Sequence, residues 1–159
     1  MNVQLFIPCF IDQLYPQVAF NMVKVLEKVG CTVTYNPNQT CCGQPAFNAG
    51  FWSESKSVCD KFLDDFNGTD YIVSPSASCT GFVRNYYGKL YENSAQINVA
   101  KKTSARIYEL SDFLINILKI EDVGATFNGK VTYHDSCAAL RECNTKTEPR
   151  KLLLSLIHI

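Results

Sequence analysis

Residues 3–35 read VQLFIPCFIDQLYPQVAFNMVKVLEKVGCTVTY, and this stretch decides the fold class. Residues 3–7 form a short apolar run typical of a β-strand, and a proline ends it. In residues 16–29 the apolar side chains recur at the spacing of one helix face, and Gly30 supplies a stop. Residues 31–35 are rich in β-branched side chains and predict a second strand. A strand, a helix and a strand in this order predict a parallel α/β unit.

The same alternation continues along the chain. Residues 46–66 predict a helix, residues 71–74 a third strand and residues 104–118 a longer helix. A further short strand is predicted over residues 131–134. Strands that alternate with helices indicate an α/β fold with a parallel sheet and flanking helices. Such sheets place their ligands at the C-terminal ends of the strands.

Length, composition and charge restrict the class of protein. With 159 residues, of which 47% are hydrophobic, the chain can bury one substantial core. Its 15 basic and 15 acidic residues balance without a block of like charge, so we expect no nucleic-acid partner. The first residues lack the basic start and continuous apolar run of a signal peptide, and no segment is apolar enough to span a bilayer. We therefore expect a cytoplasmic protein with no direct membrane span.

The chain holds 8 cysteines, which is many for its length. Without an export signal, they indicate metal or redox ligands rather than structural disulfides. Cys9 follows the first predicted strand, and Cys79 follows the third. Cys41 and Cys42 lie in the turn-rich loop after the second strand. We expect the fold to bring these three cysteine-bearing loops together at one site.

The spacing of these cysteines narrows the chemistry of the site. A local zinc knuckle takes ligands in pairs about two to four residues apart, which this chain does not offer. Adjacent Cα atoms lie only about 3.8 Å apart, so a disulfide between Cys41 and Cys42 would be strained. A cluster of several irons can bind adjacent thiolates on different metal atoms. Gly43 allows close approach of the backbone, and Pro45 stiffens the loop. From the residues alone, a cluster, a zinc ion and metal-free redox thiols all stay open.

Four short motifs together carry a family resemblance. They are PC at Cys9, CCG at residues 41–43, PSASC ending at Cys79 and YHDSC ending at Cys137. Over residues 1–154 the chain resembles the cysteine-rich (CCG) domain family. Members of that family include the heterodisulfide reductase B subunit, the glycolate oxidase iron-sulfur subunit and the lactate utilisation protein A group. The resemblance is strongest to the last of these groups.

The resemblance implies a protein of two similar α/β lobes, each with its own cysteine motif. Residues 1–125 would form the first cysteine-rich lobe, and residues 126–154 the beginning of a truncated second lobe. Residues 155–159, SLIHI, are typical of translated vector sequence, so we expect a non-native tail there.

The resemblance also implies a function. It predicts an iron-sulfur-binding electron-transfer subunit of an oxidoreductase rather than an autonomous catalyst. The reaction of the complex would be oxidation of L-lactate, or a similar 2-hydroxy acid such as glycolate, to the 2-oxo acid. The partners would be the iron-sulfur and accessory subunits of a lactate-utilisation-type complex. The alternative is a zinc-binding structural or assembly module that uses the same cysteines.

The predicted ligands follow from these motifs, and no residue is predicted to be catalytic. Family members with a noncubane cluster carry a further cysteine where this chain has Phe82. Four thiolates suit a conventional [4Fe-4S] cluster, which is the cofactor we expect. Cys31, Cys59 and Cys143 are expected to be buried without a ligand role, and the roles of His134 and Arg141 stay open. The cofactor-binding residues are predicted to be Cys9, Cys41, Cys42 and Cys79 with Gly43 and Pro45 shaping the loop, and Cys137 is predicted as a further metal ligand.

Overall fold

Four short segments rich in β-branched and apolar residues pair as parallel strands. The strands are β1 Asn2–Leu5, β2 Thr32–Tyr35, β3 Tyr71–Ser74 and β4 Ile107–Glu109. In this computed structural model, which describes residues 1–157, the sheet order is β2-β1-β3-β4. Because β1 pairs with β2 on one side and β3 on the other, Val3 lies opposite both Val33 and Tyr71. The predicted α/β class, with a parallel sheet, is confirmed.

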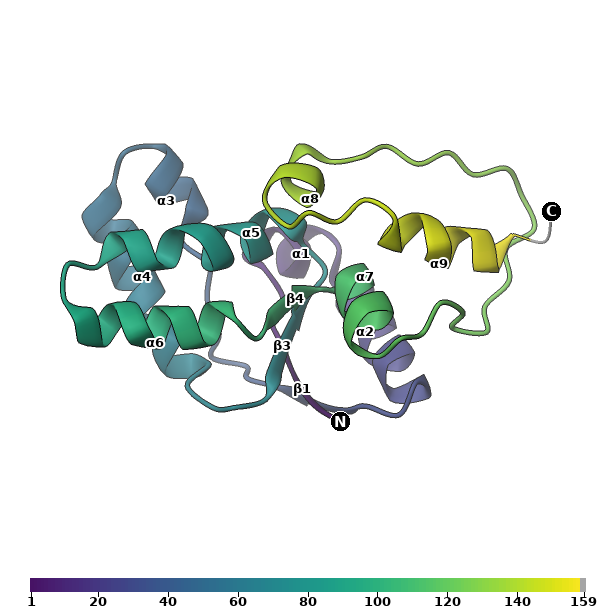
Figure 1. Cartoon of the computed structure of the whole chain (residues 1–159), viewed down its shortest axis with the longest axis horizontal. Coiled ribbons are helices and arrows are strands. Elements are labelled where there is room, and N and C mark those ends of the chain that lie inside the picture. The colour runs from purple at the N-terminus through teal and green to yellow at the C-terminus, as the bar shows by residue number, and fades with distance from the viewer. Residues whose placement is uncertain (158–159) are drawn as a thin grey trace.

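Helices flank this sheet on both faces (Figure 1). They are α1 Cys9–Leu14, α2 Pro16–Lys28, α3 Gln44–Asn48, α4 Trp52–Asp65, α5 Ala77–Tyr86, α6 Ser94–Ser104, α7 Leu110–Asp112, α8 Cys137–Arg141 and α9 Glu148–Leu156, with a 3-10 turn η1 Tyr87–Leu90 and a π-helical turn η2 Phe113–Ile117. In Figure 1, α4, α5 and α6 lie on one side of the strands, and α2 and α7 lie on the other. Among the described residues, no helix is both long enough and apolar enough to cross a membrane.

Two apolar cores hold these layers together, one on each face of the sheet. On the face of α4 and α5, Phe6 packs edge-on against Phe62 with ring centroids 4.8 Å apart. On the opposite face, Val3 packs among residues that include Met22 and Leu26 of α2. Burial of each such large apolar side chain stabilises the fold by about 1.5–3 kcal/mol. The strand ends and the loops that follow them are therefore held by packing from both sides.

Two predicted helices differ from the structure for identifiable reasons. The helix predicted over residues 46–66 is divided into α3 and α4, because Gly50 adopts the left-handed conformation with φ +85°. The segment predicted as a helix over residues 104–118 contains the end of α6, then β4, whose Ile107 pairs with Ile72 of β3, and only then α7 and η2. The apolar spacing of that segment fits a helix, but residues 107–109 pair with β3 at the edge of the sheet and form a strand. Helix α6 has no counterpart among the predicted elements.

The segment after η2 contains the least regular structure. The strand predicted over residues 131–134 does not form, since within the described residues no strand pairs with it and its side chains are exposed. Arg150 of α9 instead donates two hydrogen bonds, of 2.6 and 2.5 Å, to the carboxylate of Asp135. The predicted lobe boundary at residue 125 stays a prediction. The predicted tail is partly helical, and its residues 158–159 lie outside the described residues.

Candidate metal centre

The four predicted ligands line one hollow at the C-terminal edge of the sheet. β1, β2 and β3 are neighbours and run in the same direction, so the loops that follow them meet at this edge. Cys9, Cys41, Cys42 and Cys79 all line the hollow, whose volume is about 560 Å³. That volume lies within the range of about 300–1,000 Å³ that is common for ligand pockets. Sequence segments far apart are thus brought together as predicted.

Cys9 is the most open of these four thiols. Pro8 has the extended conformation with ψ 148° and precedes the helix, so Cys9 is the first residue of α1. Its side chain lies at the exposed rim of the hollow, whereas Cys42 is only 1% exposed. The four cysteine side chains therefore differ in their exposure to solvent, from exposed Cys9 to buried Cys42.

The CCG loop requires glycine at its third position. Gly43 has φ +89°, which side chains other than glycine rarely adopt. A Cβ atom built there would lie 3.1 Å from the carbonyl oxygen of Ser55 and 3.2 Å from its Oγ. The same Oγ donates a 3.0 Å hydrogen bond to the carbonyl of Gly43. Pro45 stands in the first turn of α3, where proline suits a helix start.

A glutamine fastens the loop before Cys41 to the end of β1. Oε1 of Gln39 accepts a 2.7 Å hydrogen bond from the backbone N–H of Ile7. Its Nε2 donates to the carbonyl oxygen of Leu5 at 3.1 Å. These bonds link the second cysteine loop to the strand that leads to Cys9. Sequence reasoning missed Gln39, since no motif marks a residue whose partners are so distant along the chain.

Cys79 is delivered by the start of α5. Ser76 caps this helix, and its Oγ accepts a 3.5 Å hydrogen bond from the backbone N–H of Cys79. The helix begins at the hollow, so its positive end faces the region where thiolates would carry negative charge. A thiolate at this position is therefore favoured over one in the helix interior.

The pKa values of the four cysteines are shifted in different directions by burial and by the neighbouring thiols. A hydrogen bond from the Cys42 thiol lowers the pKa of Cys41 to about 5. The neighbouring Cys42 thiol also lowers the pKa of Cys79, to about 7. The pKa of Cys42 itself is raised, because the neighbouring sulfurs of Cys41 and Cys79, together with burial, favour its protonated form. Burial raises the pKa of Cys9. Binding of a metal by these thiols would displace the protons that they hold.

The donor set fits a cofactor that takes soft sulfur ligands. Thiolates favour zinc, copper(I) and iron-sulfur clusters. Within residues 1–157, no three cysteine, histidine or acidic side chains are placed to hold a single metal ion. A single zinc ion needs every sulfur within about 2.3 Å of one point. In a cluster, each thiolate can bind its own iron, so the sulfurs need not converge as closely.

Among the described residues, the remaining cysteines do not line the hollow. Cys137 begins α8 and is exposed, although its neighbours Ser136 and Ala138 line the hollow. Its predicted ligand role stays a prediction. Cys31, Cys59 and Cys143 are buried, as expected.

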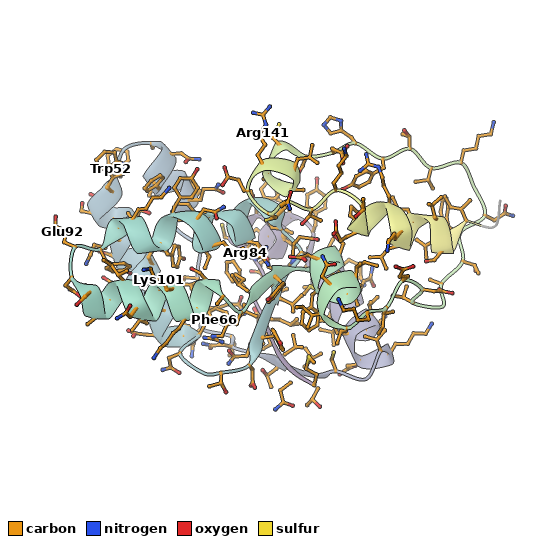
Figure 2. All side chains as sticks on the ribbon, viewed as in Figure 1. Trp52, Phe66, Arg84, Glu92, Lys101 and Arg141 are labelled. Carbon is orange, nitrogen blue, oxygen red and sulfur yellow. The ribbon has the colours of Figure 1, made fainter. Side chains whose placement is uncertain are left out.

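Two polar residues that the sequence left open lie outside the hollow. His134 is exposed. Arg141 points away from the molecule at the end of α8 (Figure 2). Neither side chain contributes to the lining of the hollow in the described part of the chain.

A parallel α/β sheet with four thiols gathered at its C-terminal edge defines a cysteine-rich domain protein. Comparison with known families agrees with this class, since the family model named CCG, the cysteine-rich domain, matches residues 3–84 and includes all four cysteines. The chain belongs to the cysteine-rich (CCG) domain family, as its motifs predicted.

Curated relatives extend the similarity to most of the chain. Lactate utilization protein A from Geobacillus kaustophilus (strain HTA426) and from Bacillus subtilis (strain 168) are each 40% identical to it over 153 residues. The match covers 96% of this chain and 64% of each relative, so the chain spans just under two thirds of their length. The corresponding protein of Oceanobacillus iheyensis is 39% identical over 160 residues. No solved structure matches the chain.

Proposed function

We propose that this chain holds an iron-sulfur cluster in the thiolates of Cys9, Cys41, Cys42 and Cys79, and that it is an electron-transfer subunit of an oxidoreductase. The gathering of four thiols from three loops in one hollow carries the proposal. Thiolates are the usual ligands of such clusters. The adjacent pair Cys41 and Cys42 favours a cluster over zinc, because neighbouring thiolates can bind different irons of one cluster.

A [4Fe-4S] cluster is the form that the donor count favours. Phe82, at the position of the additional family cysteine, is 1% exposed and packs in the core against Phe47 and Tyr87. A phenyl ring offers no ligand, so four thiolates remain for the cluster. The cluster would supply one-electron transfer. The chain's own residues would hold it, donate backbone N–H bonds to sulfur and limit the access of water.

The proposed reaction follows from the relatives. Their name, lactate utilization protein A, points to oxidation of L-lactate, or a similar 2-hydroxy acid, to the 2-oxo acid. Such an oxidation releases two electrons and two protons, and this chain would conduct the electrons. We propose that the iron-sulfur and accessory subunits of a lactate-utilisation complex are its partners, with the substrate bound in one of them. A second lobe beginning near residue 126, with Cys137 as a ligand of its own site, belongs to the same proposal.

Anaerobic iron and sulfide analysis tests the cluster. We expect brown protein with iron and acid-labile sulfide, and loss of both in Cys41→Ser and in Cys42→Ser. Cys31→Ser is the matched control, because Cys31 is buried in the core on the other face of the sheet and should leave the iron content unchanged. Colourless protein with stoichiometric zinc, or iron retained in both loop variants, would reject the proposal.

A further inference from the structure

The carbonyl group of Cys42 is anchored by a tyrosine that the sequence does not connect with the site. Oη of Tyr87 donates a 2.8 Å hydrogen bond to this oxygen, and Tyr87 is fully buried, at 0% exposure. Sγ of Cys59 approaches the same oxygen at 3.7 Å as a second, weaker donor. In the sequence, Tyr87 lies close to other aromatic residues, among them Phe82, Tyr86 and Tyr91. Its hydroxyl does more than fill the core.

The other side of the same peptide group faces a ligand sulfur. The N–H of Gly43 donates to Sγ of Cys41 at 3.4 Å. The Cys42–Gly43 peptide is planar and trans, so its C=O and N–H groups point in opposite directions. A donor that fixes the C=O group therefore also fixes the direction of the N–H group. Tyr87 on one side and the sulfur of Cys41 on the other determine the tilt of this one peptide plane.

The next peptide group of the loop is held as well. Oγ of Ser55 donates to the carbonyl of Gly43 at 3.0 Å from within the core. Gly43 lies between these two anchors in its left-handed conformation. The loop thus has little freedom to turn its N–H group away from the sulfur of Cys41.

An N–H bond to a ligand sulfur affects the electron affinity of a cluster. Such bonds withdraw charge from the thiolate and stabilise the reduced, more negative state, which raises the reduction potential. A hydrogen bond accepted by the C=O group also polarises the peptide and strengthens its N–H bond. Both effects of the Tyr87 hydroxyl would raise the reduction potential of the cluster.

We propose that Tyr87 is a positioning residue that raises the reduction potential of the cluster by orienting the Cys42–Gly43 peptide. This inference rests on the proposed function, because it requires the cluster to be present. It assigns the hydroxyl of a buried tyrosine outside the cysteine motifs a part in setting that potential.

The test is the midpoint potential of the iron-loaded protein carrying Tyr87→Phe, which removes only the hydroxyl. We expect iron content close to that of the wild type and a potential shifted to a more negative value. Tyr91→Phe is the matched control, because its hydroxyl donates to Asp60 at 2.8 Å and not to the CCG loop. That variant should leave the potential unchanged.

The outcomes separate this inference from the proposed function. Wild-type protein without iron and sulfide would reject both. A loaded Tyr87→Phe protein with the wild-type potential, or an equal shift in Tyr91→Phe, would overturn the role of Tyr87 alone. If the Tyr87→Phe variant binds no iron, the potential of a Cys59→Ala variant is measured instead. This substitution removes the weaker donor to the Cys42 carbonyl. We then expect a smaller shift of the same sign, and no shift would overturn the inference.

Discussion

Replacement of Gly43 by alanine tests whether the CCG loop is as tightly constrained as the structure indicates. At φ +89° the new side chain strains the backbone by about 1–2 kcal/mol. Its Cβ atom would also lie 3.1 Å from the carbonyl oxygen of Ser55, closer than ordinary contact. Crowding in a packed site adds about 1–2 kcal/mol. We expect the free energy of unfolding to fall by about 2–4 kcal/mol in total.

The chain supplies a control that isolates the crowding. Gly30 has a similar conformation, φ +84°, but a Cβ atom there would meet nothing within 4 Å. Gly30→Ala should therefore lose only the backbone term of about 1–2 kcal/mol. For a protein of this size, 1 kcal/mol corresponds to a change in Tm of about 2–4 °C. The expected decreases in Tm are roughly 4–16 °C for Gly43→Ala and roughly 2–8 °C for Gly30→Ala.

Differential scanning calorimetry of both variants, with iron analysis of the same samples, completes the experiment. Crowding at Ser55 must move either that residue or the loop, so Gly43→Ala should also bind less iron. Gly30→Ala should load as the wild type does, because its turn lies away from the hollow. Equal decreases in Tm for the two variants, together with equal iron contents, would refute this account of the loop.

Three further substitutions test other contacts within the fold. Gln39→Ala leaves the N–H of Ile7 without its partner and should lower the free energy of unfolding by about 1–3 kcal/mol, measured by urea denaturation; an unchanged midpoint would contradict this. In Gly81→Ala, the added methyl group would collide with the side chain of Glu142, just after α8, and should displace that segment. Limited proteolysis within residues 126–136 should therefore become faster than in the wild type. Asp112→Asn removes the carboxylate that forms an ion pair with Arg84 of α5, a mostly buried arginine. It should lower stability by about 1–3 kcal/mol, and a change within 0.5 kcal/mol, about the usual effect of a surface substitution, would show that the pair is dispensable.

The cysteine edge of the sheet could be predicted because its signals are local. A few β-prone residues followed by a break placed Cys9 and Cys79 after strands, and the order of strands and helices implied a common edge. The strand β4 and its pairing with β3 could not be predicted from local sequence in the same way. The apolar residues after Ile107 continue at helical spacing through α7 and η2, so the pattern hides the change from strand to helix. Which segment fills a sheet edge depends on tertiary pairing.

The polar support of the site was beyond sequence reasoning for a different reason. Gln39, Ser55 and Tyr87 each make a hydrogen bond to a backbone group in another part of the chain. Their neighbours in the sequence suggest a turn, a helix and an aromatic patch, and none of these patterns specifies a hydrogen-bond partner. Cys59 was correctly expected to be buried, yet the approach of its thiol to the Cys42 carbonyl depends on how α4 packs. Long-range geometry, not residue type, distinguishes these supports from ordinary core residues.

Two separate parts of the chain form the hollow that holds the four thiols. The sulfurs of the four proposed ligands come from residues 9–79, whereas Ser136 and Ala138 line the same hollow from much further along the chain. Substitutions at Ser136 and Ala138 can therefore change the wall of the hollow without removing any of these four sulfurs. Residues far apart in the sequence thus supply the thiols and part of the surrounding wall, so each can be substituted separately.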